Sequence, residues 1–329
     1  MKRIMVTGAL GQIGSELIAT LRGRYGRDQV VGTDIRMPIG SDPRATGPFE
    51  LLDVLDPNHL TRVMQIYDIG TIYHLAAILS AVGESQPNQA WRINVNGLYN
   101  VLEAARYYRC QVFFPSSIGV FGPTTPRDYT PQDTVQRPET MYGVTKLTGE
   151  LLCDYYHRRF DIDTRGLRFP GLISYKTDPG GGTTDYAVEI FYAAVRHSRY
   201  TCYLRPDTSL DMMYMPDAIR AMIELMQADP ARLRHRNAFN LAAMAFTPEQ
   251  LAAAIRRRIA DFEISYRVDP ARQTIADSWP NCMDDSAARA EWGWRPEYDL
   301  ERMVDDMLEH VAERADEPHD STSRARRGS

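Results

Sequence analysis

Short apolar runs alternate with longer amphipathic stretches through the first half of this 329-residue chain. A short apolar run bounded by turn-forming residues is typical of a buried strand, and apolar residues at helical spacing predict a helix that packs on one face. The alternation predicts an α/β fold, a Rossmann-type doubly wound parallel sheet with helices on both faces. The predicted strands are residues 4–6, 30–34, 71–77, 112–117 and 163–169, and the predicted helices are residues 15–22, 88–108 and 142–159.

The second half of the chain has a mixed pattern, which predicts a smaller C-terminal part. Residues 170–172 interrupt the regular alternation, and helices are predicted at 186–196 and 218–226. The chain then turns polar near its end. We expect residues 314–329 to form a disordered tail.

A glycine-rich turn joins the first predicted strand to the first predicted helix. Gly8, Gly11 and Gly14 have GxxGxxG spacing, with Gln12 and Ile13 between the last two glycines. Glycines let the backbone approach a pyrophosphate closely, and a helix N-terminus offers free N–H groups and a partial positive charge. Strand, glycine-rich turn and helix in this order predict a dinucleotide-binding site.

Asp34 ends the second predicted strand, twenty positions after Gly14. A carboxylate at that place accepts hydrogen bonds from the adenosine ribose and repels a 2′-phosphate, which favours NAD over NADP. Arg36 keeps NADP open, because an arginine nearby can meet that phosphate. The alternative interpretation of Asp34 is an ordinary turn residue at the end of a strand.

Two further places along the chain are candidates for cofactor contacts. Asp53, before Val54, ends a short apolar segment and offers a carboxylate to the adenine amino group. Its alternative interpretation is the start of the next helix, with Asp56 as the N-cap. The small residues at 75–77 end a predicted strand and leave room for a ligand, as open α/β sheets do at their carboxyl edge.

Tyr142 and Lys146 are separated by one turn of the predicted helix 142–159. Residues i and i+4 lie on the same face of a helix, so the phenol and the ammonium point into one site. A neighbouring cation favours the phenolate, which prepares a tyrosine to take a proton from an alcohol. Ser117, at the end of a predicted strand, supplies a hydroxyl donor. The alternatives are an incidental surface pair and a turn-forming serine.

Three consecutive glycines precede two threonines within residues 178–185. One interpretation is a loop that ends in a helix cap. The other is a lid that folds over a small polar substrate, with the glycines as hinges. The sequence leaves these two interpretations equal.

The composition excludes several function classes. The net charge is −5, so no nucleic-acid partner is expected. The four cysteines show no CxxC or metal-type spacing and predict reduced thiols in a cytoplasmic protein. The seven histidines form no HxxxH or HExxH pattern, so no metal is expected. No segment has the length of a membrane span, and no membrane partner is expected.

The glycine motif, Asp34, Ser117 and the Tyr142–Lys146 pair together resemble the extended short-chain dehydrogenase/reductases, a group that includes sugar-nucleotide epimerases. Within that group, the chain is similar to the short-chain type of L-threonine 3-dehydrogenases from residue 1 to about residue 307. The stretches that carry this narrower similarity are residues 136–146, 168–174, 179–188 and 212–217.

This resemblance implies NAD-dependent oxidation of the 3-hydroxyl of L-threonine to 2-amino-3-ketobutyrate, a step of threonine catabolism. It implies that Tyr142 is the general base, that Lys146 lowers its pKa and holds the nicotinamide ribose, and that Ser117 hydrogen-bonds the reacting oxygen. Hydride then passes from the substrate Cβ to the nicotinamide. The expected cofactor-binding residues are Gly8, Gly11, Gln12, Ile13, Gly14, Asp34, Asp53, Val54, Leu75, Ala76, Ala77, Asn94, Tyr142, Lys146 and Pro170.

Threonine brings a carboxylate, an ammonium and a methyl group to the site. The guanidinium of Arg127 suits the carboxylate, because an arginine fork binds a carboxylate with two parallel hydrogen bonds. Ser80, Thr183 and Thr184 offer hydroxyls, and Trp279 offers an apolar wall against the methyl group. Together with Ser117 and Tyr142, these are the expected substrate-binding residues.

The resemblance also implies how the chain is organised. Residues 1–170 are expected to form the NAD-binding Rossmann domain, to which later segments return, and residues 171–313 the main substrate-binding part. Members of the group often form homodimers through two helices, here those at 88–108 and 142–159. We therefore expect a homodimer.

Two other function classes stay open. A sugar-nucleotide epimerase or dehydratase predicts tightly held NAD and no net NADH formation. Residues 168–174 depart from the Arg-x-x-Asn-Val-Tyr-Gly pattern of the epimerases, which argues against that substrate class. A non-catalytic NAD-sensing protein predicts cofactor binding without turnover, and the intact Ser117, Tyr142 and Lys146 argue against it.

Overall fold

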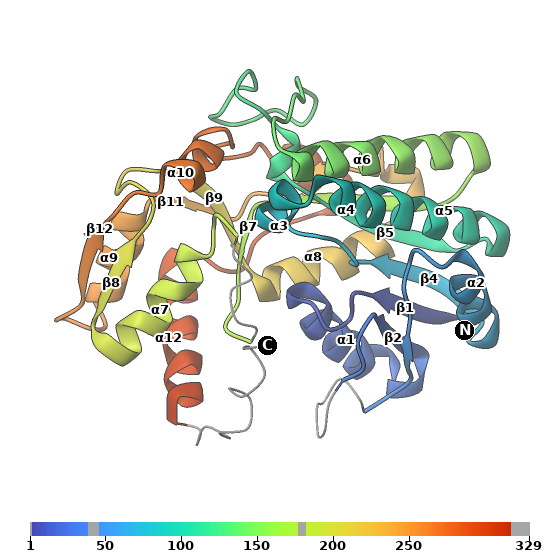
Figure 1. Cartoon of the computed structure of the whole chain (residues 1–329), viewed down its shortest axis with the longest axis horizontal. Coiled ribbons are helices and arrows are strands. Elements are labelled where there is room, and N and C mark those ends of the chain that lie inside the picture. The colour runs from blue at the N-terminus through green and yellow to red at the C-terminus, as the bar shows by residue number, and fades with distance from the viewer. Residues whose placement is uncertain (1, 39–45, 177–181, 317–329) are drawn as a thin grey trace.

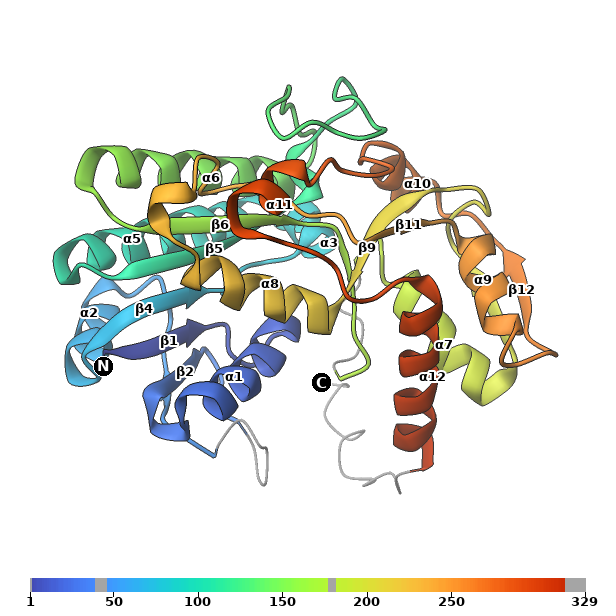
Figure 2. The same cartoon turned by 180° about the vertical axis from the view of Figure 1, so that it is seen from behind.

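The central sheet of the protein has seven strands, all parallel: β1 (Arg3–Thr7), β2 (Val30–Asp34), β3 (Phe49–Leu51), β4 (Ile69–His74), β5 (Gln111–Ser117), β6 (Thr164–Phe169) and β10 (Phe239–Asn240). The computed structural model describes residues 2–38, 46–176 and 182–316. The strand order is β10-β6-β5-β4-β1-β2-β3, which runs outward in both directions from the β1/β4 pair (Figures 1 and 2). This is the doubly wound arrangement, and it confirms the predicted fold class.

Helices cover both faces of this sheet. Those on one face include α1 (Gln12–Tyr25) and α8 (Met215–Gln227), and those on the other include α2 (Pro57–Ile66), α5 (Gly97–Tyr108) and α6 (Met141–Phe160). Along β1, Ile4 and Val6 join the first core and Met5 the second, because side chains alternate along a strand. Each large apolar side chain that is fully buried contributes roughly 1.5–3 kcal/mol.

Two elements of this layered part come from the second half of the chain. β10 pairs with β6, with Phe239 opposite Leu167 and Asn240 opposite Arg168. Helix α8 places Met222 in the same buried cluster as the β1 and α1 side chains. The strands β1 to β6 lie within residues 1–170, and the seventh strand is supplied from beyond them.

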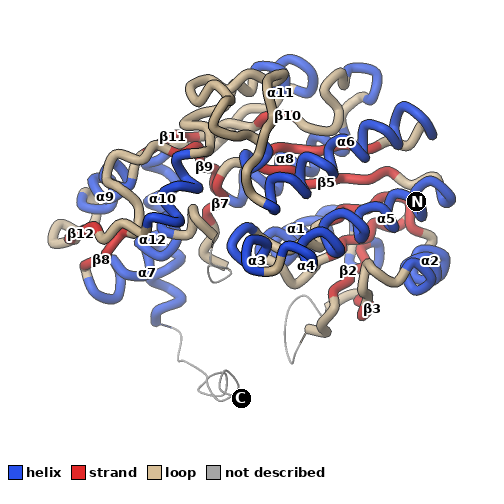
Figure 3. The backbone as a smooth tube through the Cα atoms, turned by 45° about the horizontal axis from the view of Figure 1, so that its top comes forward, coloured by secondary structure: helices blue, strands red, loops and turns tan. Residues whose placement is uncertain are grey.

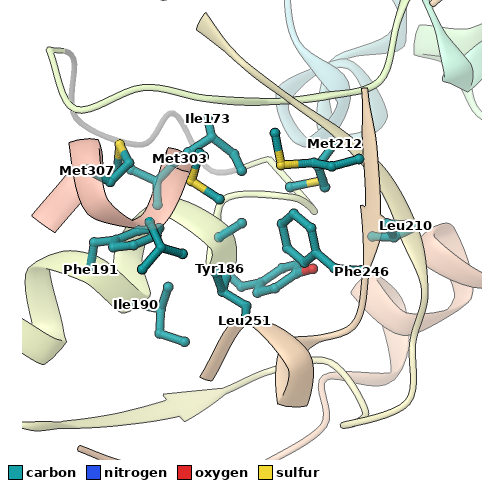
Figure 4. Packing of buried hydrophobic residues seen from close by; sticks show 14 of the residues in the cluster. Ile173, Tyr186, Ile190, Phe191, Leu210, Met212, Phe246, Leu251, Met303 and Met307 are labelled. Carbon is teal, nitrogen blue, oxygen red and sulfur yellow. The ribbon is translucent and has the colours of Figure 1, made fainter. Parts of the chain in front are cut away.

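A second, smaller part carries two short sheets. β7 (Gly171–Ile173), β9 (Leu210–Tyr214) and β11 (Met244–Phe246) form one in the order β11-β9-β7, and β8 (Arg199–Cys202) pairs with β12 (Glu263–Tyr266) in the other. Figure 3 shows β7 and β9 between the central sheet and α7 (Tyr186–His197), α9 (Pro248–Arg256) and α12 (Leu300–Asp316). Figure 4 shows Phe191 of α7, Phe246 of β11 and Met303 of α12 within the hydrophobic core of this part.

The predicted helix at residues 88–108 is a helical run of three pieces. α4 (Pro87–Trp91) and α5 are joined by η3 (Arg92–Asn96), one turn of π-helix. Asn94 lies in this turn, where its amide donates to the Ile78 carbonyl at 3.1 Å and to Thr145 Oγ1 at 3.0 Å and accepts from the Ile78 N–H at 2.7 Å. A π turn redirects one side chain of a helix, and hydrophobic periodicity does not reveal it.

Two segments differ from the predictions. Residues 171–173 form β7 where irregular backbone was predicted, because the chain pairs there with β9. Helix α12 continues to Asp316, so the predicted tail begins too early at residue 314. The rest of that tail and residues 178–181 of the predicted lid lie outside the described residues.

The predicted N-cap at Asp56 is confirmed. The Asp56 carboxylate accepts hydrogen bonds from the N–H groups of Asn58 and His59 and caps α2, as the alternative interpretation of this segment proposed. Of the helices in the described ranges, none has the length and apolar character needed to cross a membrane. The remaining helical segments are η1 (Arg27–Gln29), α3 (Ser80–Ser85), η4 (Ile118–Val120), η5 (Pro230–Arg232), α10 (Pro270–Asp277) and α11 (Ser286–Trp292).

Candidate active site

A cavity of about 250 Å³ lies at the carboxyl ends of the central strands. This is the edge at which parallel α/β sheets bind ligands. Its walls come from the glycine-rich turn after β1, the loop after β4, the end of β5, α6 and residues 182–185. The predicted site residues that line it are Gly8, Gly11, Gln12, Ile13, Gly14, Leu75, Ala77, Ser80, Ser117, Tyr142, Lys146, Pro170, Thr183, Thr184 and Trp279.

The glycine-rich turn is packed too closely to accept side chains. Gly8 has a φ of +66°, and a Cβ atom there would lie 2.8 Å from the Ala76 backbone nitrogen. A Cβ atom on Gly14 would lie 2.2 Å from the Gly8 carbonyl oxygen. Helix α1 begins beside this turn at Gln12, with Gly11 as an N-cap that supplies no side-chain acceptor. The free N–H groups of that helix end suit a pyrophosphate.

The Asp34 carboxylate lies at the end of β2, beside the glycine-rich turn. One of its oxygens accepts a hydrogen bond from the Leu10 N–H at 3.0 Å, and the other accepts from the Arg36 N–H at 3.3 Å. Arg36 Nε lies 3.8 Å from the same carboxylate, so its charge is directed toward Asp34. A buried carboxylate in this place fits a ribose with free hydroxyls better than a ribose with a phosphate.

Two residues that were not predicted, Thr7 and His74, tie the end of β1 to the loop after β4. Thr7 Oγ1 accepts hydrogen bonds from the N–H groups of Leu75 at 3.1 Å and Ala76 at 3.3 Å, and lies 3.0 Å from His74 Nδ1. Its own hydrogen is therefore directed to Nδ1. Burial lowers the pKa of His74 to about 3, and the Lys146 ammonium acts in the same direction, so the imidazole is neutral. The signal in the sequence is a polar residue at the carboxyl end of each of two strands.

Ser117, Tyr142 and Lys146 meet at one wall of the cavity. The Ser117 hydroxyl hydrogen-bonds the Tyr142 phenol and also accepts from the Gly119 N–H at 3.1 Å. Lys146 Nζ donates to the Pro115 carbonyl at 2.7 Å and lies 5.6 Å from the centroid of the Tyr142 ring. A hydroxyl donor, a phenol and an ammonium therefore converge as the YxxxK spacing predicts.

Burial dominates the electrostatics of this wall. It raises the pKa of Tyr142 to about 12, while the hydrogen bond from Ser117 acts in the opposite direction. It lowers the pKa of Lys146 to about 8, while the Glu150 carboxylate acts in the opposite direction. The predicted lowering of the Tyr142 pKa by Lys146 is thus outweighed by burial. Because the two groups are close together, their protons leave in coupled steps.

The structure places Arg127 outside the cavity lining. Its Nε donates to the Trp279 carbonyl at 3.1 Å and its Nη2 to Asn281 Oδ1 at 3.0 Å. The guanidinium thus holds the segment that carries Trp279, one of the cavity walls. This geometry argues against a direct contact between Arg127 and a substrate carboxylate.

Four other predicted cofactor residues besides Asp34 also lie outside the lining. Asn94 is engaged with the Ile78 backbone, and the Ala76 N–H is bonded to Thr7. The Asp53 carboxylate accepts from the Leu55 N–H at 2.9 Å. Val54 packs against α5, where a Cβ atom on Gly97 would lie 2.8 Å from its Cγ2.

Asp185 lines the cavity and was not among the predicted residues. Its Oδ2 accepts a hydrogen bond from the Gly182 N–H at 2.7 Å, which shapes the turn that presents Thr183 and Thr184. The Tyr203 hydroxyl, 3.3 Å from the carbonyl oxygens of Gly182 and Thr183, holds the same turn from the other side. The signal for Asp185 is its place directly before the predicted helix 186–196. The other lining residues that were not predicted are Leu79, Pro115, Ser116, Ile118, Phe169, Gly171, Leu172 and Gly182.

Comparison with known proteins places this site in a family. A model of the NAD dependent epimerase/dehydratase family matches residues 4–242. The chain belongs to this family. It is 53% identical over 311 residues to an uncharacterized epimerase/dehydratase of Staphylococcus saprophyticus, and the match covers 94% of this chain and 97% of that protein.

Solved structures similar to this family member include an L-threonine dehydrogenase from Clostridium difficile. That structure is 55% identical, with a TM-score of 0.94, and the match covers 95% of this chain and 98% of that chain. A monomeric L-threonine 3-dehydrogenase from a metagenome is 44% identical, with a TM-score of 0.90 and a match over 94% of this chain and 99% of that chain. The similarity therefore spans both parts of the fold.

NAD is the cofactor of the NAD dependent epimerase/dehydratase family, and the residues of this chain fit it. The turn from Gly8 to Gly14 leaves a backbone cradle that side chains would fill. The N-terminus of α1 offers N–H groups to a pyrophosphate, and Asp34 stands at the end of β2 for the ribose. The chain is thus an NAD-dependent enzyme of this family.

Proposed function

We propose that this enzyme uses NAD to oxidise the 3-hydroxyl of L-threonine to 2-amino-3-ketobutyrate, a step of threonine catabolism. The observation that carries the proposal is one cavity with two kinds of wall. Ser117, Tyr142 and Lys146 form the wall that handles an alcohol, and the hydroxyl residues Thr183 and Thr184 stand in the same cavity. Two similar solved structures bear the name of threonine dehydrogenases, which agrees with this assignment.

In this proposal Tyr142 takes the proton of the substrate hydroxyl, and Ser117 donates a hydrogen bond to the same oxygen. Lys146, one turn further along α6, favours the phenolate through its positive charge and reaches the nicotinamide ribose. When bound, NAD would supply the acceptor for the hydride that leaves the substrate Cβ. Because Tyr142 is buried, its phenolate forms only where such positive charges are near.

The substrate contacts are assigned to lining residues. Ser80, Thr183 and Thr184 offer hydroxyls to the carboxylate and ammonium groups of threonine, and Trp279 offers its ring to the methyl group. Arg127 is given a different role, to hold Trp279 in place. We assign residues 1–170 with β10 and α8 to NAD, and the smaller part to the substrate.

We also propose that the enzyme forms a homodimer through α5 and α6. Both helices expose large apolar side chains: Tyr99 and Tyr107 on α5, and Val144, Leu151 and Tyr155 on α6. Contiguous exposed apolar surface of this kind is typical of an interface. Sedimentation of the purified protein tests the dimer, and a monomer at micromolar concentration would contradict it.

The four cysteines are free thiols, which fits a reducing compartment such as the cytoplasm.

The decisive experiment is NADH absorbance with purified protein, NAD and L-threonine, with L-serine and D-threonine as controls. NADH formation that depends on L-threonine is the expected result. No NADH, with NAD binding established separately by calorimetry, would overturn the proposal. The same sample tested with sugar nucleotides would then detect epimerisation, the reaction expected of the other named branch of the family. Binding without any turnover would favour an NAD-sensing protein.

A further inference from the structure

Consecutive residues at the end of β5 each bond a different residue on one face of α6. The Pro115 carbonyl oxygen accepts a hydrogen bond from the Lys146 ammonium, and the Ser117 hydroxyl bonds the Tyr142 phenol. Between these two contacts, Ser116 Oγ donates to Glu150 Oε1 at 2.5 Å. Tyr142, Lys146 and Glu150 are spaced four residues apart, so they form one stripe along α6. The reacting groups and the Glu150 contact therefore share a single strand–helix junction.

Glu150 is one half of a buried ion pair with Arg168 of β6, and the two side chains are 5% and 6% exposed. Arg168 donates from Nε and Nη2 to the two carboxylate oxygens of Glu150, each at 2.9 Å. Gln136 adds a donor to the carboxylate at 3.1 Å. The remaining Nη1 of Arg168 donates to the Gln132 carbonyl at 2.9 Å and to Asn240 Oδ1 at 3.0 Å. These contacts hold the two charged groups together. Loss of either partner would leave a buried unpaired charge, which is strongly destabilising.

The charges around Lys146 come from three elements. Tyr142 and Glu150 face it from α6, His74 from β4, and Arg168 stands behind Glu150 on β6. Strand β5 contributes a carbonyl acceptor. His74 is neutral, so the charges that act on the Tyr142–Lys146 pair from behind are those of Glu150 and Arg168. These two charges are opposite in sign, and the Glu150 carboxylate is the nearer along α6.

We propose that the Glu150–Arg168 ion pair is a positioning unit for the oxidation. Through Ser116 it holds the end of β5 against α6, and its two opposite charges keep the field at Tyr142 and Lys146 balanced. Both residues lie outside the cavity lining, so they act through other residues and touch no substrate. The inference rests on the proposed function, which the wild-type enzyme tests in the same assay.

The test is a charge cycle read as the pH profile of kcat/KM for L-threonine. Glu150→Gln leaves a positive charge behind Lys146, which favours the phenolate and the neutral amine, so the profile moves to lower pH. Arg168→Gln leaves a negative charge and moves the profile to higher pH. Each shift is expected to be about half a pH unit, for a charge roughly 10 Å away at an effective dielectric near 40. The double variant Glu150→Gln/Arg168→Gln is neutral again, and its profile returns to that of the wild type.

Ser116→Ala separates the mechanical role from the charges. It removes the link to β5 and leaves the ion pair intact, so kcat is expected to fall about tenfold, as for a misplaced reacting group, without a shift of the profile. The KM for NAD stays within about twofold, because the cofactor contacts lie elsewhere. Arg165→Gln is the matched control, since this arginine is buried at the opposite end of β6 and pairs with Asp163. It lowers stability and leaves the pH profile in place.

Single variants that lower activity without opposite shifts would overturn the proposal and leave a merely structural ion pair. A double variant that keeps the shift of either single variant would also overturn it. The shifts are read without turnover from the ultraviolet absorbance of the Tyr142 phenolate, taken as the difference between each variant and the same variant carrying Tyr142→Phe. Absence of NADH from the wild type would refute the proposed function, while this titration still decides the role of the ion pair.

Discussion

Lys146 lies one helical turn beyond Tyr142 on α6, and its ammonium is 5.6 Å from the centroid of the phenol ring. The same ammonium donates a hydrogen bond to the Pro115 carbonyl. In the proposed mechanism the lysine acts on the phenol through its charge, while Ser117 is the residue that bonds the phenolic oxygen. This division of roles leads to the first two predictions.

Tyr142→Phe removes the only atom of this side chain that accepts a proton and changes the cavity shape very little. We expect kcat/KM for L-threonine to fall by about 10³-fold, within the range for a general base. NAD affinity, measured by calorimetry, should change by less than about threefold, since the glycine-rich turn and Asp34 are untouched. Tyr129→Phe is the control, because that side chain is exposed on a loop. Retention of most activity by the Tyr142 variant would refute its role.

The pH dependence follows from the buried Tyr142–Lys146 pair. The pKa of Tyr142 is raised to about 12, so the phenolate is scarce at neutral pH and becomes more abundant as pH rises. We expect kcat/KM to rise about tenfold per pH unit until the pair loses its first proton. Lys146→Met removes the cation, disfavours the phenolate and moves the rise to higher pH. A profile that is flat from neutral to alkaline pH, with chemistry rate-limiting, would count against a tyrosinate base.

We predict that Asp34 sets the preference between the two nicotinamide cofactors. Its buried carboxylate lies at the end of β2, where a carboxylate would accept from an adenosine ribose and repel a 2′-phosphate. Asp34→Ser should raise the ratio of NADP to NAD efficiency by at least about tenfold, because a close pair of like charges costs several kcal/mol. Asp56→Ser is the control: it removes a carboxylate of the same half of the chain but keeps an N-cap on α2. An unchanged ratio in the Asp34 variant would mean that the ribose binds elsewhere.

Arg127 is expected to act through Trp279. Arg127→Gln and Trp279→Ala should each raise the KM for L-threonine, the former by less than about tenfold, and the double variant should be no worse than the tryptophan variant alone. A direct ion pair between Arg127 and the substrate carboxylate predicts a larger loss, on the order of 2–5 kcal/mol, and a KM effect that survives in the Trp279→Ala background.

The buried carboxyl group of Asp211 is expected to make the stability of the folded protein depend on pH. It is buried on β9, where its Oδ2 accepts a hydrogen bond from the Met283 N–H at 2.9 Å, and burial raises its pKa from 3.8 to about 7. A raised folded-state pKa means that its contribution is fully present below about pH 4 and is lost as pH rises through 7. Asp211→Asn keeps an acceptor oxygen and no charge, so above pH 7 it should be more stable than the wild type, by roughly 2–4 kcal/mol.

Urea unfolding of the Asp211→Asn variant at pH 5 and pH 8 measures this difference. The gain should be large at pH 8 and small at pH 5. Asp261→Asn, at an exposed position, is the control and should show no such dependence. Equal stabilities of the Asp211 variant and the wild type at pH 8 would contradict the prediction.

The sequence predicts the sheet and the shared wall of Tyr142 and Lys146 well, because both depend on short-range patterns. Apolar runs mark β1, β2, β4, β5 and β6, and the i,i+4 spacing alone places Tyr142 and Lys146 on one face. Contacts between segments that are far apart in the sequence cannot be predicted from such patterns. Arg127 looks like a free carboxylate receptor until the chain folds and brings Trp279 and Asn281, more than 150 positions away, to its guanidinium.

The Tyr142 pKa shows a second limit. A neighbouring lysine in the sequence predicts a lower value, yet burial outweighs the lysine, and burial is a property of the whole fold. The π turn at Asn94 is a third case. The Asn94 side chain there is bonded to Ile78 and Thr145, and the spacing of apolar residues does not reveal these contacts.

Strand β10 comes from the second half of the chain but completes the central sheet, and this limits where the chain can be divided. A fragment that stops at residue 170 would retain the glycine-rich turn and all three reacting residues, yet β6 would be a bare edge open to pairing with other chains. Arg168 would lose Asn240 from its partners, and α8 would be missing from one face of the sheet. Segments of the second half of the chain are therefore part of the NAD-binding layers, so the two parts do not correspond to two separable halves of the sequence. A split of the gene between the two parts would therefore break the β6–β10 pairing and should be made elsewhere.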